Sequence, residues 1–356
     1  DNLSDTNNAT YKIVGQQIRS YAVRVKETTD QKPTVNILKG NITNSIGGGV
    51  YVSGGSVALG NTANTADSDL QVETKGTALF NTSYTDVGAD SWWYYLNKQG
   101  GNAIEVQGGI FVRNTDSSAV SNQVTINGGF FYGYNSGYNL GENGRRVGPG
   151  ASAGLYVMGH SLTVTINGGT FGNKGNVSNS AASFFGTPGG KRAQVYIKGG
   201  NFYGSKSDVM SVFRYVDFVF DASDATTPIR VENANGDASA ALSVQDDLIY
   251  KNNYYYPDRG STIDIRNGNF IATGAGIYYG SSVDKLIVSG GTFEGNGDYA
   301  INFAYSPGST QVKLSGGIFR RTNTSIWNVL GGTGYSEDNV NNILESGYTC
   351  LLYTSD

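Results

Sequence analysis

The chain has 356 residues and a formal net charge of −4, and its 25 lysines and arginines are scattered rather than gathered in a basic stripe. This distribution excludes a nucleic-acid groove, and no run of about 18 apolar residues predicts a membrane span. With 51 glycines, only 6 prolines and 38% apolar residues, the composition excludes collagen-like and proline-rich chains and favours short strands joined by many turns.

One unit recurs along the chain, with the form apolar-x-apolar-x-Gly-Gly-x-Phe. Its strict copies lie at residues 104–111, 124–131, 164–171, 195–202, 286–293 and 312–319, and looser copies lie at 35–42, 50–57 and 263–270. Each copy opens with the two-residue alternation of a strand that has one buried face. The glycine pair then permits a sharp bend, after which the Phe turns inward.

The spacing of the copies favours a solenoid. Their first apolar positions advance by 20, 40, 31, 68, 23 and 26 residues from the copy at 104 onward. Values of 20 to 26 predict one turn, and 40 or 68 predict two or three turns with a degenerate copy. Further strands at 154–157, 275–278 and 300–303 give two or three short strands per turn. Stacked turns predict a buried aromatic ladder of Phe111, Phe131, Phe171, Phe202, Phe270, Phe293 and Phe319.

The expected division of the chain follows the repeat. Residues 1–34 form an N-terminal lead-in or partial turn, 35–330 the parallel β-helix, and 331–349 a C-terminal partial turn. Residues 350–356 resemble the in-frame translation of a transposon adapter used in shotgun DNA sequencing, so we expect an artefact at the end of a metagenomic fragment; the alternative is an ordinary C-terminal strand. This interpretation removes the only cysteine, and a cysteine-free polar chain is compatible with secretion.

Segments that depart from the repeat are the places where functional residues are expected. They are residues 62–101, 132–154, 178–192 and 216–258, the last being an inserted strand pair or a long loop. Because flat aromatic rings pack on sugar faces, the candidate carbohydrate-binding residues are Trp92, Trp93, Tyr134, Tyr138, Tyr254 and Tyr255. The alternative is that such rings fold back and plug the loops against the solenoid.

The sequence predicts no catalytic constellation. The triplet 114–116, Gly159-His160 and Asp246-Asp247 resemble parts of the polygalacturonase motif set, but their order is wrong. Two neighbouring carboxylates in one strand face opposite ways, whereas a glycosidase needs two carboxyl groups about 5 to 9.5 Å apart. Asp264 and Arg266, on one outward strand face, remain as an enzymatic alternative. His160 is the only histidine, so no two-histidine metal site forms, and we predict no metal and no cofactor.

The copies at 164–171 (VTINGGTF) and 286–293 (LIVSGGTF) resemble β-helix repeat regions in large surface proteins of gut Firmicutes. This resemblance covers about residues 35–330 and implies an all-β fold, a right-handed single-stranded parallel β-helix with long loop insertions, in line with the general preference for right-handed crossovers. It also implies a non-enzymatic, extracellular or cell-surface module for adhesion or glycan contact, with a glycan or host-surface ligand as partner, and we expect a monomer. The alternatives are a polysaccharide lyase or glycoside hydrolase of the β-helix type, and a phage tailspike or fibre.

Overall fold

A computed structural model of the chain describes residues 21–28, 31–44, 48–61, 69–74, 109–114, 122–133, 154–172, 180–186, 190–204, 208–223, 227–233, 240–245, 260–281, 284–297, 299–304, 306–308, 310–321, 329–332 and 340–347.

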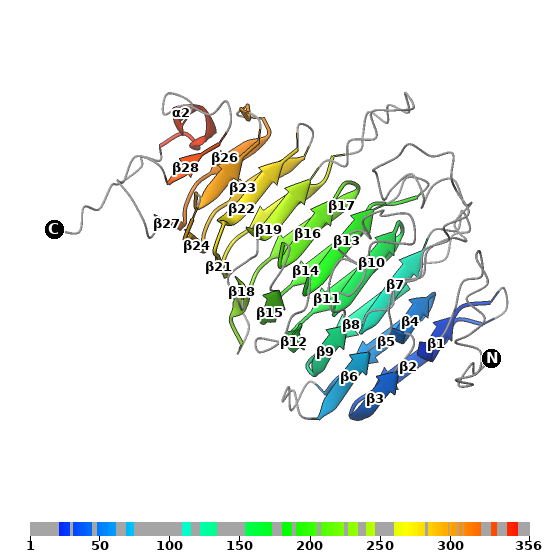
Figure 1. Ribbon diagram of the computed structural model, residues 1–356. Coiled ribbons are helices and arrows are strands. Elements are labelled where there is room, and N and C mark those ends of the chain that lie inside the picture. Colours follow the sequence, from blue (N-terminus) through cyan, green and yellow to red (C-terminus); the bar gives the residue numbers. More distant parts are fainter. Residues whose placement is uncertain are drawn as a thin grey trace, which may run out of the picture.

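Three parallel sheets wind these residues into a parallel β-helix (Figure 1). Sheet 1 has ten strands, and sheets 2 and 3 have nine each. Every turn contributes one strand to each sheet in the same order, so that β10, β11 and β12 form one turn and β13 then pairs directly with β10. Each turn therefore has three strands, and the sheets run the length of the solenoid.

Sheet 1 contains β1 (Tyr21–Lys26), β4 (Gly48–Ser53), β7 (Ile110–Asn114), β10 (Leu155–Gly159), β13 (Ala182–Gly186), β16 (Met210–Phe213), β19 (Ala240–Gln245), β22 (Ala275–Gly280), β25 (Ile301–Phe303) and β28 (Leu330–Gly331). Sheet 2 contains β2 (Thr34–Ile37), β5 (Gly55–Leu59), β8 (Asn122–Ile126), β11 (Leu162–Ile166), β14 (Ala193–Ile197), β17 (Val216–Phe220), β20 (Thr262–Ile265), β23 (Lys285–Val288) and β26 (Val312–Leu314). Sheet 3 contains β3 (Gly40–Asn44), β6 (Leu70–Thr74), β9 (Phe130–Gly133), β12 (Thr170–Phe171), β15 (Gly200–Gly204), β18 (Ile229–Asn233), β21 (Asn269–Ala272), β24 (Thr292–Gly295) and β27 (Ile318–Arg321).

The core is a stack of inward side chains from all three sheets, and sheet 3 carries an aromatic ladder. Six of the residues expected in this ladder belong to it: Phe131, Phe171, Phe202, Phe270, Phe293 and Phe319. The ladder consists of two groups of three rings, the first three and the last three of this list. Within each group, neighbouring rings stack at centroid distances of 4.8 to 5.2 Å. Val231 lies in register between Phe202 and Phe270 and separates the two groups.

The bend between sheets 2 and 3 depends on glycine. At Gly129 and Gly169 the φ angles are +119° and +103°, a region that residues with a Cβ rarely adopt. A Cβ at Gly129 would also lie 2.9 Å from the carbonyl oxygen of Leu70. The glycine pair of the repeat therefore allows both the bend and the close stacking of successive turns.

Two copies of the repeat do not join sheet 2 to sheet 3 as the others do, and the prediction for Phe111 is wrong. Phe111 lies in β7 of sheet 1, opposite Tyr51 and Tyr156, and not in sheet 3. The copy at 50–57 begins in β4 of sheet 1 and ends in β5 of sheet 2. Glycine pairs also occur at the entry to sheet 1, where a Cβ at Gly109 would lie 2.6 Å from the carbonyl oxygen of Gly154. Glycine pairs therefore occur at all three corners of the solenoid, and the pattern alone does not show which corner a copy forms.

Two other expectations are corrected by the strand pairing. The 40-residue step from Val124 to Val164 is a single turn with a long insertion, because β8 pairs directly with β11. The segment 216–258 is not only a break, since it holds β17, β18 and β19, one from each sheet. Its repeat is hidden because the bend between β17 and β18 carries Pro228 and no glycine pair.

The described chain ends in the short helix α2 (Val340–Ile343), which packs on the last turn. Ile343 is buried in the core, and Leu344 forms a bridge with Leu314 of β26. Among the described residues, no helix has the length and apolar character needed to span a membrane.

Candidate ligand-binding face of sheet 1

The longest segments that depart from the repeat precede or follow strands of sheet 1 along the chain. The bend from sheet 2 to sheet 3 is short in most turns, as between β11 and β12. In contrast, residues 75–108 and 134–153 precede β7 and β10 of sheet 1 in the sequence, and residues 246–259 follow β19. Because binding residues concentrate in loops held by a rigid scaffold, the outer face of sheet 1 is the first place to look for a ligand site.

The aromatic candidates from the sequence fall in these insertions. Trp92, Trp93, Tyr134, Tyr138, Tyr254 and Tyr255 all lie outside the described residues. Their role in carbohydrate binding therefore stays a prediction.

The middle of the outer face of sheet 1 is aromatic and buried. Tyr156, Met158, Phe185 and Phe213 occupy outward positions, yet none is more than 6% exposed. The rings of Phe185 and Phe213 stack at 4.0 Å, and Tyr156 lies 5.5 Å from Phe185. From β10 to β16, sheet 1 is therefore packed on both faces.

A polar cluster interrupts this aromatic layer. The Nε2 of Gln245 donates to the carboxylate of Asp208 at 3.1 Å, and to the hydroxyl of Ser243 at 2.6 Å. Burial raises the pKa of Asp208 from 3.8 to about 6, and hydrogen bonds from Ser243, Gln245 and the backbone of Ala240 limit the rise. Asp208 can therefore change its charge near neutral pH.

The C-terminal end of the same face is half-buried and carries two tyrosines. Tyr278, Asn302 and Gly331 lie in register on β22, β25 and β28. The ring of Tyr299 lies over Gly331, where a Cβ would be 2.3 Å from the tyrosine Cε1. The ring of Tyr278 lies over Gly280 in the same way, with a separation of 2.6 Å. We call Tyr278, Asn302 and Tyr299 the tyrosine platform.

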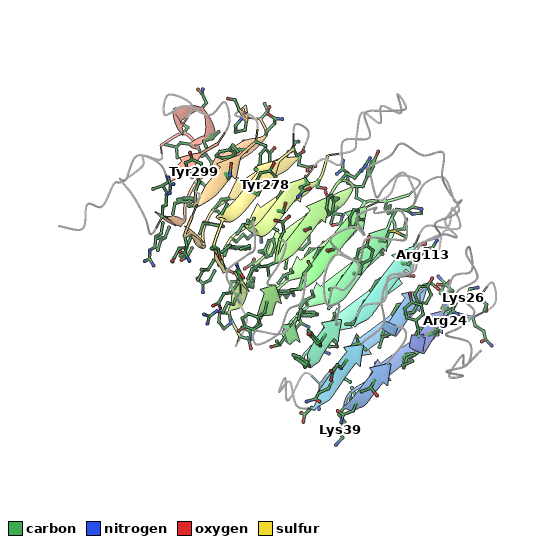
Figure 2. The ribbon with its side chains drawn as sticks, in the orientation of Figure 1. Arg24, Lys26, Lys39, Arg113, Tyr278 and Tyr299 are labelled. Carbon is green, nitrogen blue, oxygen red and sulfur yellow. The ribbon has the colours of Figure 1, made fainter. Side chains whose placement is uncertain are left out.

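Arg321 borders the tyrosine platform. Its Cζ lies 5.0 Å from the ring centroid of Tyr299, and its Nη2 donates to the carbonyl oxygen of Gly297 at 3.3 Å. Two strand spacings, about 10 Å, separate Tyr278 from Gly331 beneath the other ring. Figure 2 shows Tyr278 and Tyr299 together at the C-terminal end of the solenoid. Two rings and an amide thus face outward over the length of a short sugar segment.

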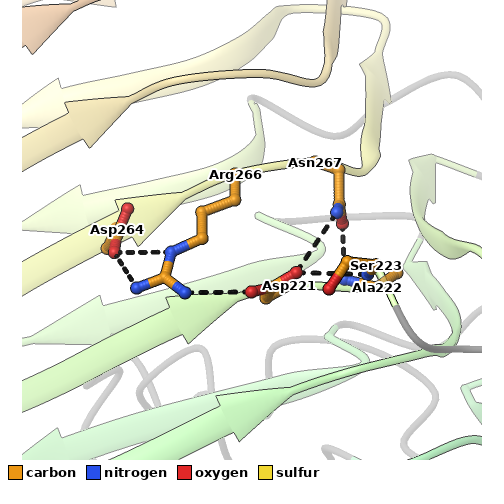
Figure 3. Close-up of polar contacts among 6 residues, drawn as sticks. All are labelled: Asp221, Ala222, Ser223, Asp264, Arg266 and Asn267. Atoms are coloured by element: carbon orange, nitrogen blue, oxygen red, sulfur yellow. Dashed lines mark hydrogen bonds and ion pairs between the residues drawn. The ribbon is translucent and has the colours of Figure 1, made fainter.

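On the outer face of sheet 2, Asp264 and Arg266 belong to a closed ion-pair network (Figure 3). The guanidinium of Arg266 lies 2.9 Å from the carboxylate of Asp264 and 2.9 Å from that of Asp221. Hydrogen bonds from Ser223, together with Arg266, lower the pKa of Asp221. Because one arginine holds both carboxylates in ion pairs, this arrangement favours a structural role over acid–base chemistry.

His160 is also placed by the structure. It is 3% exposed at the bend between β10 and β11, and its Nδ1 lies 3.2 Å from the hydroxyl of Ser161. His160 follows the turn glycine Gly159, which predicts a position on the surface, and its burial corrects that expectation. Within the described ranges, no group of three or more histidines, cysteines and carboxylates could hold a metal ion.

No protein-family model, no curated protein and no solved structure matches this chain.

Sequence reasoning missed the tyrosine platform. The strand that carries Tyr278 was expected, and alternation places Tyr278 opposite the inward residue Ile277, so an outward tyrosine could have been read from the pattern. The position of Tyr299 could not, because its ring rests on a glycine 32 positions later in the chain.

Proposed function

We propose that this chain is an extracellular or cell-surface bacterial module that contacts glycans in adhesion and does not catalyse a reaction. The observation that carries the proposal is the tyrosine platform, in which two half-buried rings lie over glycines on one face of a rigid sheet.

The chemistry of these groups suits a sugar. A flat tyrosine ring offers apolar area to the apolar face of a pyranose, and its hydroxyl adds a hydrogen-bonding tip. The Asn302 amide between the rings both donates and accepts, as sugar hydroxyls require, and the nearby guanidinium of Arg321 supplies further donors. Since both rings stand on consecutive turns of one scaffold, little ordering is needed on binding.

A glycan-array screen of the full chain tests this proposal. We expect binding to at least one glycan class, reduced tenfold or more by Tyr278→Ala and by Tyr299→Ala. Tyr196→Ala is the matched control, because Tyr196 is half-buried on the outer face of sheet 2. Equal losses in all three variants, or no binding to any glycan, would contradict the proposal. Release of reducing ends from the bound glycan would contradict its non-catalytic part.

A further inference from the structure

The outward positions of sheet 1 carry charge of one sign. Across the described strands of this sheet, those positions hold Arg24 and Lys26 in β1 and Arg113 in β7, and no carboxylate. The chain as a whole has a net charge of −4, and the outer face of sheet 2 mixes both signs, as with Asp217 and Lys285. The N-terminal end of sheet 1 is therefore a local cationic region.

Aromatic rings hold one of these cations in place. The Cζ of Arg24 lies 5.3 Å from the ring centroid of Tyr51, and that ring lies 4.9 Å from the ring of Tyr21. Both tyrosines are nearly buried, at 6% and 8% exposure, so they form a fixed floor. The guanidinium is pre-organised by this contact, which lowers the ordering needed to bind an anion.

Arg24 and Lys26 are exposed and available. Neither forms an ion pair with any of the described residues, whereas Lys32 lies 3.8 Å from Glu27. Two residues apart on one face of β1, they are spaced by about 7 Å. Arg113 lies two strands further along the row of Lys26 but is only 9% exposed. Figure 2 shows these three at one edge and Lys39 at another.

We propose that Arg24 and Lys26 bind the carboxylate or sulfate groups of an anionic polysaccharide. This inference rests on the proposed function and names the class of glycan. A guanidinium pairs with a planar carboxylate or a sulfate through two parallel hydrogen bonds, and the ammonium adds a second point of charge. Two cations spaced along a strand suit successive acidic groups of a polymer better than one small ion.

The test compares acidic and neutral polymers of the same backbone by biolayer interferometry at low and moderate salt. Polygalacturonate against its methyl ester reports carboxylate recognition, and dextran sulfate against dextran reports sulfate recognition. We expect each acidic polymer that binds to do so at least tenfold more tightly than its neutral partner, with binding weakened by salt. The double variant Arg24→Gln/Lys26→Gln should bind it about five- to tenfold more weakly.

A matched control removes the same charge elsewhere. Lys39 and Lys198 are exposed residues away from sheet 1, so Lys39→Gln/Lys198→Gln should leave binding within about twofold. Equal binding of acidic and neutral polymers, sensitive to Tyr299→Ala, would overturn this inference and leave the proposed function standing. Loss in the Arg24/Lys26 variant with none in the tyrosine variants would support this inference and contradict the platform. Equally tight binding to a DNA oligonucleotide of matched charge would overturn the assignment to glycans.

Discussion

Sheets 1 and 2 have the same parallel pairing and the same inward alternation of apolar side chains, yet their outer faces differ. On sheet 2 the outward residues are mostly half-buried and polar, and Arg266 links two carboxylates there. On sheet 1 the middle outward residues are aromatic and buried, and the ends carry the cations and the tyrosine platform. The repeat therefore determines the inside of the solenoid, whereas the insertions at its corners accompany the specialised outer face.

The largest effect is expected in the core that all three sheets enclose, at the aromatic ladder of sheet 3. Phe202→Ala removes a fully buried ring that stacks on Phe171 at 4.8 Å. The free energy of unfolding should fall by about 3 to 5 kcal/mol, measured by urea denaturation. Thr165→Ala, on the outer face of sheet 2, is the control and should change it by less than about 0.5 kcal/mol. Similar values for both would show that the ladder does not form the core.

The second prediction compares the two outer faces directly. Phe213→Ala truncates a ring that is 6% exposed and stacked on Phe185, so unfolding should become easier by about 2 to 4 kcal/mol. Tyr196→Ala on sheet 2 truncates a half-buried ring and should cost less than about 1 kcal/mol. Equal losses in the free energy of unfolding would show that the outer face of sheet 1 is not packed more tightly than that of sheet 2.

The third prediction concerns pH. The pKa of Asp208 is about 6 in the folded chain, and its ordinary value is 3.8. Between pH 3.8 and pH 6, the folded chain therefore binds a proton at Asp208 that the unfolded chain releases. The associated stability is fully present below pH 3.8 and lost as pH rises through 6. Asp208→Asn should therefore be about 2 to 3 kcal/mol more stable than the parent at pH 8 and nearly equal to it at pH 3.5. A difference that does not change with pH would contradict the buried, protonated carboxyl.

The smallest effect is expected in the ion-pair network on sheet 2. The lowered pKa of Asp221 has the opposite sign to Asp208, so its contribution is present above pH 3.8 and lost as pH falls below that value. Since Arg266 is half-exposed, Arg266→Gln should lower the free energy of unfolding by less than about 1 kcal/mol at pH 7, and by less still in 1 M salt. A large, salt-independent loss would show that the network is not a solvated surface feature.

The fold was predictable because its key signal is local. An alternating strand, a glycine pair and an inward Phe lie within a few residues of each other, and six rings of the ladder followed from that pattern. The sheet to which Phe111 belongs was not predictable, since alternation is the same in every sheet and glycine pairs occur at all three corners. The 68-residue step predicted a degenerate copy, and β17 is that copy, since β14 pairs with β17 and β17 with β20. Its position could not be located from the pattern because a proline-containing bend replaces the glycine pair.

The candidate site was less predictable because it depends on contacts between turns. Arg24 over Tyr51 and Tyr299 over Gly331 join residues 27 and 32 positions apart, and no periodicity within one turn reports them. Alternation shows which side chains point outward but not what covers them. The packing of the outer face of sheet 1 could therefore not be predicted from the pattern of a single turn.

The most direct test of the account is hydroxyl-radical footprinting of the full chain, with and without the glycan that binds most tightly on the array. Tyrosine oxidation at Tyr278 and Tyr299 should fall by half or more when the glycan is bound, and oxidation at Tyr196 should not change. Protection of Tyr196, with Tyr278 and Tyr299 unaffected, would place the ligand on sheet 2 and contradict the assignment of the binding face to sheet 1.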